Sequence, residues 1–335
     1  MPPVRQAGTL VIHRYTSRVL AGNPLGDPVE RDLYIYLPPG YDPAAKRKCP
    51  ALLAIAGFTG NGAMLFNRDP LAEGLKERLD RLISTGKCPP VIVAAPDCFT
   101  RLGGNQYINS SAIGRYEDYL VKEIVPFVTR VYRTGRWGIF GKSSGGYGAI
   151  VQGMRHSEVF EAIADHSGDS DFELCYLDEF PAALDAWRKA GGPARWLDAF
   201  WKDANRRLRH HGYPLNMLAM SAHYSPNPKM KKTLGIDFPF DLKTGEFRPA
   251  VWARWRAWDP VNMVPRHLKN LRRLKFIYID CGSKDEFHIH WGTRALTAAL
   301  RKHGLKVHYE EFDDGHMSIA YRYDVSVPLL AKALQ

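Results

Sequence analysis

The segment Trp137-Gly138-Ile139-Phe140-Gly141-Lys142-Ser143-Ser144-Gly145-Gly146-Tyr147-Gly148 decides the fold. A short apolar run precedes Gly-x-Ser-x-Gly, and the Gly-rich stretch that follows can enter a helix. This is the layout of a nucleophile elbow, in which a strand, a sharp turn and a helix present a serine at the apex. The turn crowds the backbone around Ser143, and Gly141 and Gly145 relieve the crowding because they lack a Cβ. The motif predicts Ser143 as a nucleophile, although the same five-residue pattern also arises by chance in a chain with 29 glycines.

Apolar runs on both sides of this segment predict a parallel sheet. Residues 51–56, 90–95 and 137–140 are continuously apolar, as expected of strands that are buried on both faces. The stretches 62–84 and 113–132 between these strands predict helices. Strands that alternate with helices predict an α/β fold with a mostly parallel, doubly wound sheet. Further strands are expected at residues 9–15, 31–37, 160–164, 275–280 and 306–312, the first two of them antiparallel.

Residues 170–258 interrupt this alternation and contain six of the eight tryptophans. The first part, to about residue 211, predicts helices, whereas residues 224–228 and 235–249 predict loops. We expect a helical, aromatic-rich lid inserted into a core of residues 1–169 and 259–335. Trp187, Trp201 and Trp255 are predicted to contact substrate. The alternatives are that the aromatic residues form a small core of their own or a dimer surface.

A serine hydroxyl needs a base to remove its proton, and the base needs an acid to orient it. In chains with an elbow of this type the acid and then the histidine follow the serine. The strand at 276–280 leads into the loop with Asp285, and the next strand leads into the loop with His316. We therefore predict Asp285 as the acid and His316 as the base, with Asp280 and Glu286 as rival acids.

The oxyanion of an acyl-transfer reaction needs two hydrogen-bond donors. The backbone N–H groups of Ser144 and Phe58 are predicted for this role, because both follow the expected strands directly. Other residues at the same rim are predicted to contact substrate, and they are Gly57, Thr59, Lys142 and His166. A hydrogen-bonded structural role is the alternative for His166. His288 and His290 alternate like strand residues beside Asp285, but no further ligand pattern accompanies them, so no metal is predicted.

Composition excludes several classes of protein. The net charge of +11 comes from basic residues spread along the chain, which favours a solvated basic surface over nucleic-acid binding. No apolar run reaches the length of a membrane span, and the N-terminal residues lack a secretory core, so a cytoplasmic protein is expected. Five scattered cysteines argue against zinc and disulfides. We expect a small-molecule ester as partner, no nucleic acid, membrane or cofactor, and possible homo-oligomers.

The chain also resembles the Putative esterase family of α/β-hydrolases. This group includes S-formylglutathione hydrolases, feruloyl esterases, enterochelin esterases and mycolyltransferases. The resemblance rests on residues 31–41, 107–119 and 141–149. It implies an α/β-hydrolase fold and maps Ser143, Asp285 and His316 onto the triad, and Phe58 and Ser144 onto the oxyanion donors. Departures from the family pattern are Ala56, where many members have His or Asp, Ser144 in place of a common Met, and the insertion, which matches no member.

The expected activity is that of a serine carboxylesterase, in which an acyl group passes to Ser143 and water then releases it. An acyltransferase that uses the same intermediate is the alternative, because the motifs do not tell whether water or an alcohol attacks the acyl-enzyme. A non-catalytic binding protein on the same scaffold is the third possibility, and the complete Ser143, Asp285 and His316 set argues against it. The insertion predicts a preference for bulky or aromatic substrates over acetyl esters.

Overall fold

The computed structural model describes residues 7–230 and 233–335, without the side chains of residues 208–211. In this part of the chain, the main sheet has eight strands in the order β1-β2-β4-β3-β7-β8-β9-β10. β1 and β2 pair antiparallel at one edge, β2 also runs antiparallel to β4, and the strands from β4 to β10 are parallel. This arrangement confirms the predicted α/β-hydrolase fold class. The strand bounds are β1 Thr9–Thr16, β2 Glu30–Leu37, β3 Ala51–Ile55, β4 Ile92–Pro96, β7 Trp137–Lys142, β8 Phe160–His166, β9 Phe276–Gly282 and β10 His308–Phe312.

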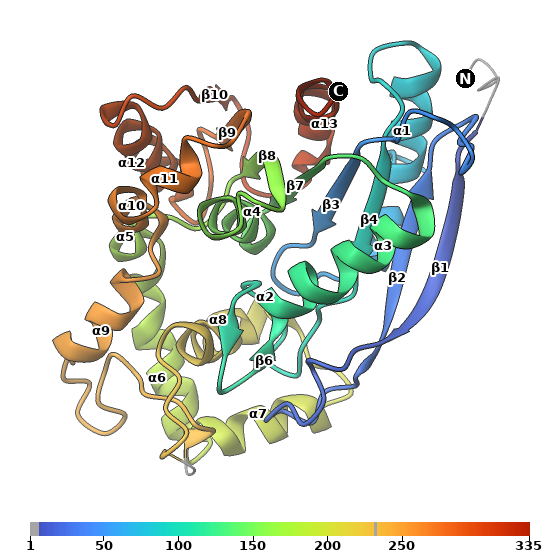
Figure 1. Cartoon of the computed structure of the whole chain (residues 1–335). Helices are drawn as coiled ribbons and strands as arrows, with labels where there is room; N and C mark the ends of the chain where they lie inside the picture. Colours follow the sequence, from blue (N-terminus) through green and yellow to red (C-terminus); the bar gives the residue numbers. More distant parts are fainter. Residues whose placement is uncertain (1–6, 231–232) are drawn as a thin grey trace.

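Helices cover both faces of the sheet, which explains why every residue of β3 and β4 is buried. α1 (Leu75–Ser84) and α13 (Tyr323–Ala333) pack on one face. The other face carries α3 (Val125–Tyr132), α4 (Ser144–Arg155) and α12 (Ile289–Lys302) (Figure 1). The central strands therefore lie between two apolar layers, and only the strand ends are left to form a site.

Two predicted helices differ in detail from the sequence-based expectation. The helix expected over residues 62–84 is broken into a short 3-10 turn, Ala63–Phe66, and α1. Pro70 lies between them, where its ring and missing N–H oppose a continuous helix. The stretch 113–132 is helical from Tyr116, as α2 (Tyr116–Asp118), a π-helical segment (Tyr119–Ile124) and α3. A small hairpin, β5 (Asn109–Ser110) and β6 (Gly114–Arg115), precedes it.

The segment between β8 and β9 forms a helical layer at the end of the sheet to which β3 and β8 point (Figure 1). Residues 225–228 and 235–248 form no helix, which agrees with the expected loops, whereas the last of its first four helices continues to Tyr224 instead of ending near residue 211. The aromatic side chains of the segment share one continuous core with the helices of the sheet. Among the described residues, no helix has both the length and the apolar character that crossing a membrane requires. The helices are α5 Phe172–Tyr176, α6 Phe180–Lys189, α7 Pro193–Lys202, α8 Leu208–Tyr224 and α9 Pro249–Arg256, and α10 Pro260–Met263 and α11 Leu268–Leu271 return the chain to β9.

Candidate active site

Ser143 occupies the sharp turn between β7 and α4. Its backbone has φ 61°, a conformation that few residues other than glycine adopt and that is common at functional turns. A Cβ on Gly141 would lie 2.5 Å from the carbonyl oxygen of Ile55, and one on Gly145 would lie 2.3 Å from the same atom. Both glycines are therefore required for β7 and α4 to approach β3 so closely. The turn holds the serine side chain at the end of the sheet, at the N-terminus of α4.

His316 and Asp285 form a buried pair on the neighbouring loops. The Nδ1 atom of His316 lies 2.7 Å from Oδ2 of Asp285, and a carboxylate in this position selects the tautomer that leaves Nε2 free. Glu286 plays a different part, since its Oε2 accepts the backbone N–H of His316 at 2.7 Å. Burial opposes ionisation of Asp285, but the hydrogen bond and charge of His316 outweigh burial and lower the pKa of this carboxyl. Asp285 is thus held ionised beside the imidazole.

The loop after β3 brings a second set of backbone donors to Ser143. An ideal Cβ on Gly57 would lie 3.4 Å from Cβ of Ser143, so this loop touches the elbow. Two hydrogen bonds fix it: the Tyr107 hydroxyl donates to the Ala56 carbonyl oxygen, and the Thr59 N–H donates to the Gly103 carbonyl oxygen at 2.8 Å. The Tyr107 contact holds the loop through the backbone of Ala56, whose own side chain is too small to anchor it.

The backbone N–H groups of Phe58 and Ser144 donate no hydrogen bond to any described residue. Both residues line the same cavity as Ser143, so both groups are available to an oxygen atom bound there. The Ser144 hydroxyl accepts a hydrogen bond from Nε2 of Gln106 at 2.9 Å, which fixes the side chain that follows the nucleophile. Gln106 was not predicted from the sequence, because no motif marks it.

A cavity of about 530 Å³ opens beside Ser143 and His316. Gly57, Thr59 and Lys142 line it, and their contact with substrate stays a prediction. Burial lowers the pKa of the Lys142 ammonium group, while nearby carboxylates, Asp285 first among them, act in the opposite direction. The helical segment supplies much of the remaining wall, through Tyr176, Glu179, Ala182, Ala186, Tyr213 and Asn216.

The prediction that three tryptophans contact substrate is wrong in this structure. Trp187 is 2% exposed and packs on Phe238, and Trp255 is fully buried, with its indole N–H bonded to Oγ of Ser225 at 2.9 Å. Trp201 lies elsewhere, with its indole N–H bonded to the carbonyl oxygen of Arg101. None of the three is among the residues that line the cavity. Trp187 and Trp255 are buried in the core that the segment shares with the sheet, whereas Trp201 is only partly buried and packs against Phe99.

His166 also lies outside the cavity, and its side chain is 1% exposed. Its Nδ1 lies 2.6 Å from Oδ1 of Asp280, and its Nε2 lies 2.8 Å from Oγ of Ser326. These three residues, from β8, β9 and α13, repeat a Ser-His-Asp arrangement that is buried and lies outside the cavity. The carbonyl oxygen of His166 accepts a hydrogen bond from the N–H of Ser143 at 2.8 Å, so the backbone of His166 helps to fix the elbow. The expectation that it lines the pocket is corrected accordingly.

His288 and His290 do not lie on a strand. His288 is the residue before α12, with φ 59°, and His290 belongs to the first turn of that helix. The strand-like alternation of these two histidines is therefore not a sign of a strand, because a loop residue followed by a helix start gives the same spacing. Their ring centroids are 6.5 Å apart.

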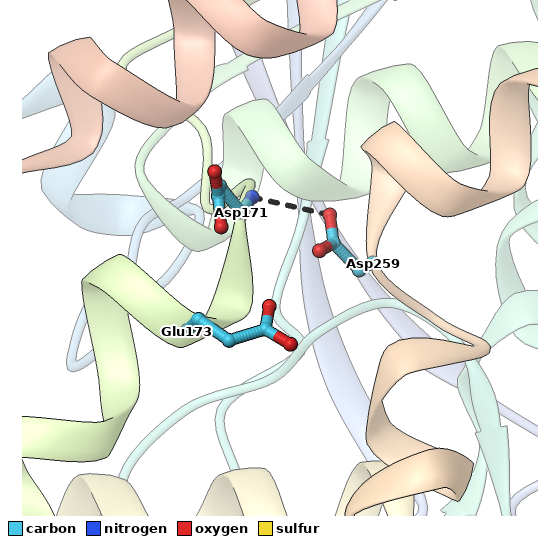
Figure 2. Close-up of side chains that lie close together, drawn as sticks. All are labelled: Asp171, Glu173 and Asp259. Atoms are coloured by element: carbon cyan, nitrogen blue, oxygen red, sulfur yellow. Dashed lines mark hydrogen bonds between the residues drawn. The ribbon is translucent and has the colours of Figure 1, made fainter.

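Three carboxylates, from Asp171, Glu173 and Asp259, lie close together where the helical segment begins and ends (Figure 2). Asp259 accepts the backbone N–H groups of Asp171 and Phe172, both at 3.1 Å, and caps α10 by accepting the N–H of Val261 at 3.0 Å. Glu173 lies 3.2 Å from the guanidinium group of Arg256. These contacts account for the arrangement, and we assign no metal to it.

Comparison with known proteins places this site in a family. Residues 28–327 match the family described as Putative esterase. The chain belongs to that family. The Putative esterase match spans the elbow and the Asp285 and His316 loops, and it confirms the resemblance derived from the sequence. No curated protein sequence matches the chain.

Solved structures share the fold over nearly the whole chain. A ferulic acid esterase has a TM-score of 0.63 and 19% sequence identity, and the match covers 98% of this chain and 100% of that chain. An S-formylglutathione hydrolase from Agrobacterium tumefaciens has a TM-score of 0.60 and 18% identity, with 98% and 96% of the two chains covered. A feruloyl esterase module from Clostridium thermocellum, in complex with sinapinate, has a TM-score of 0.57 and 16% identity, with 99% and 90% covered. Together with the family match, these structures support a hydrolase that acts on esters.

Proposed function

We propose that this protein is a serine carboxylesterase that works through an acyl-serine intermediate. The observation that carries the proposal is the 2.7 Å contact between Nδ1 of His316 and Oδ2 of Asp285, made beside the cavity that Ser143 also lines. A histidine held in this way presents Nε2 as a base, and an elbow serine presents Oγ as a nucleophile. Membership of the Putative esterase family supports the same reaction class.

In the first half of the reaction, Oγ of Ser143 attacks the ester carbonyl carbon while Nε2 of His316 takes the hydroxyl proton. The carbonyl oxygen becomes an oxyanion, and the free N–H groups of Phe58 and Ser144 are placed to donate hydrogen bonds to it. Ionised Asp285 stabilises the imidazolium that forms. Collapse of the tetrahedral species breaks the ester C–O bond, and His316 returns the proton to the departing alcohol.

In the second half, water attacks the acyl-serine carbonyl, and His316 removes one of its protons. The second tetrahedral species collapses to the carboxylic acid and a free Ser143 hydroxyl, which regains its proton from His316. The oxyanion donors act in both halves, because negative charge develops on the same oxygen each time.

The cavity volume supports a substrate with a bulky or aromatic group. About 530 Å³ is far more than an acetyl group fills, and Tyr176, Tyr213 and Phe287 contribute aromatic surface to the wall. Each Å² of apolar substrate surface removed from water there contributes about 25 cal/mol to binding. We therefore expect kcat/KM to rise from acetyl esters to longer or aryl esters.

The test is Ser143→Ala, with turnover of a p-nitrophenyl ester series as the measurement. We expect kcat to fall on the order of 10³-fold or more, because the nucleophile is removed while the binding surface remains. Ser144→Ala is the matched control, since its role requires the backbone N–H and not the hydroxyl. A fluorophosphonate probe should label Ser143 alone in the wild-type protein, as read by peptide mass spectrometry. Full activity of the S143A variant, or labelling at another serine, would contradict the proposal, and adding alcohols to the assay separates hydrolysis from acyl transfer.

A further inference from the structure

The cavity beside Ser143 contains two carboxyl groups that the hydrolytic mechanism does not use. Glu179 precedes α6 and is 5% exposed, and Asp169 follows β8 and is 7% exposed. Both line the cavity, so the small exposed surface that they keep faces its interior. The protein as a whole carries a net charge of +11, so this acidic lining is a local property of the cavity.

Each carboxyl group is only partly satisfied by the protein. Oε2 of Glu179 accepts a hydrogen bond from Nδ2 of Asn216 at 2.8 Å. Oδ2 of Asp169 accepts hydrogen bonds from the Tyr176 hydroxyl at 2.8 Å and from Nε2 of Gln106 at 3.2 Å. Among the described side chains, Oε1 of Glu179 and Oδ1 of Asp169 accept no hydrogen bond, and neither residue takes part in an ion pair. An ionised carboxylate is costly to bury when one of its oxygens lacks a partner, so a bound group that supplies this partner stabilises the ionised form.

We propose that the cavity selects esters whose bulky group carries a positively charged nitrogen, which the Glu179 carboxylate binds. This inference rests on the proposed ester hydrolysis and names the substrate class for the same site. The nitrogen would donate to the free Oε1 of Glu179, and the nearby Asp169 would add to the negative potential. Tyr176 and Tyr213 also line the cavity, and aromatic rings attract cations.

In the unliganded cavity the Glu179 carboxyl group resists ionisation, and a bound cation would change this. Burial raises the pKa of Glu179 to about 8; the hydrogen bond from Asn216 opposes this rise, and the charges of Asp178 and Asp169 add to it. A cation bound beside the carboxyl group would favour its ionised form and reverse the rise. Lys142 also lines the cavity, and the carboxylates that favour its charged form are Asp285, Glu286 and Asp169. Glu179 is not one of them, so its carboxyl group is left for the ligand.

An uncharged donor, such as a hydroxyl group, is the competing ligand. It could satisfy Oε1 of Glu179 as a hydrogen-bond acceptor, but it would leave the charge on the carboxylate uncompensated. A cation supplies the same hydrogen bond and also compensates the buried charge, which is costly when left unpaired. The two ligand classes therefore differ in binding by a measurable factor, which the experiment uses.

The kinetic test compares p-nitrophenyl ε-aminocaproate with p-nitrophenyl heptanoate, in which a methyl group replaces the ammonium group. The wild-type enzyme should prefer the amine ester in kcat/KM on the order of tenfold or more. Glu179→Gln keeps the size of the side chain and the acceptor for Asn216 but removes the charge, and it should abolish most of this preference. Asp178→Asn is the matched control, since Asp178 is exposed on the same turn and does not line the cavity, and it should keep the preference.

A binding test separates this inference from the proposed activity. Benzylamine and benzyl alcohol are titrated into the Ser143→Ala protein by calorimetry, with and without the Glu179→Gln change. We expect the amine to bind on the order of tenfold more tightly than the alcohol, and the E179Q change to remove the difference. If no ester is turned over but the amine still binds through Glu179, the proposed function fails and the cation site stands. If the wild-type enzyme prefers the neutral ester, if the alcohol binds as well as the amine, or if E179Q leaves either ratio unchanged, the inference is wrong.

Discussion

Two Asp–His pairs of nearly equal length occur among the side chains that the structure describes, and one prediction distinguishes them. Asp280 lies 2.6 Å from His166, and Asp285 lies 2.7 Å from His316. We expect Asp280→Asn to lower stability and spare catalysis, and Asp285→Asn to abolish catalysis with a smaller effect on stability. The reason is that the first pair is buried between the sheet and α13, whereas the second lies beside the cavity.

The magnitudes follow from the contacts. Asp280 is fully buried and accepts hydrogen bonds from His166, from the Tyr278 hydroxyl at 2.8 Å and from Nε of Arg322 at 2.8 Å. An amide offers these donors one oxygen and no charge, and Arg322 is only 11% exposed. Removing one partner of a buried ion pair costs about 3–5 kcal/mol, so the D280N variant should lose about that much stability.

For Asp285 the loss should appear in the rate. An amide in its place no longer selects the tautomer with Nε2 free, and comparable changes in serine hydrolases reduce kcat about 10⁴-fold. Its partners are His316, the backbone N–H of Phe287 and the Cys281 thiol, a weak donor, so we expect a stability loss of only about 1–3 kcal/mol. Glu286→Gln should reduce kcat much less, because Glu286 contacts only the backbone of His316.

The assay is equilibrium unfolding in urea, followed by tryptophan fluorescence, together with kcat measured on the folded variants under native conditions. D280N should shift the unfolding midpoint further than D285N, while its kcat stays within about tenfold of the wild type. A D280N variant of normal stability with a 10³-fold lower kcat would show that the buried pair acts in catalysis. A D285N variant with normal kcat would remove Asp285 from the mechanism.

Three further predictions concern stability, substrate size and pH. Trp255→Ala should lower the free energy of unfolding by about 3–5 kcal/mol and leave the ranking of ester substrates unchanged, because this indole packs inside the helical segment; a changed ranking in a kcat/KM series would contradict this. Ala186→Phe should reduce kcat/KM for bulky esters at least tenfold relative to acetyl esters, since Ala186 lines the cavity; a uniform loss would place it elsewhere. Burial opposes ionisation of Asp280, but His166, Arg322 and Tyr278 outweigh it and lower its pKa, so the stability gap between the wild type and D280N should be full above about pH 4 and should narrow as the pH falls further, as measured by urea midpoints; a gap independent of pH would contradict this.

The sheet and the positions of the site loops could be predicted from the sequence because their signals are local. Continuous apolar runs mark strands buried on both faces, and parallel strands bring their carboxyl-end loops to one edge. That logic is enough to bring Asp285 and His316 to the same rim, and the structure places them 2.7 Å apart. The prediction of one continuous helix over residues 62–84 is wrong because Pro70 interrupts it.

The walls of the cavity could not be predicted in the same way. Aromatic content indicated that residues 170–258 matter, but it gave no information on which helix faces point inward. The large Trp187 and Trp255 side chains fill the core of the segment, whereas small or polar residues such as Ala186 and Glu179 line the cavity. Gln106 carried no motif, and its contact with Ser144 depends on a loop whose path only the packed structure defines.

Asp259 joins the two ends of the helical segment that lies between β8 and β9. Its carboxylate lies 3.1 Å from the backbone nitrogen of Asp171, so the long segment between them begins and ends at one place. The entropic cost of closing a loop rises by only about 0.6 kcal/mol for each doubling of its length. A segment anchored in this way can lengthen, shorten or be exchanged between relatives without moving Ser143. Evolution can therefore change the segment that lines the substrate cavity as a unit, and so change substrate choice, while the catalytic groups stay in place.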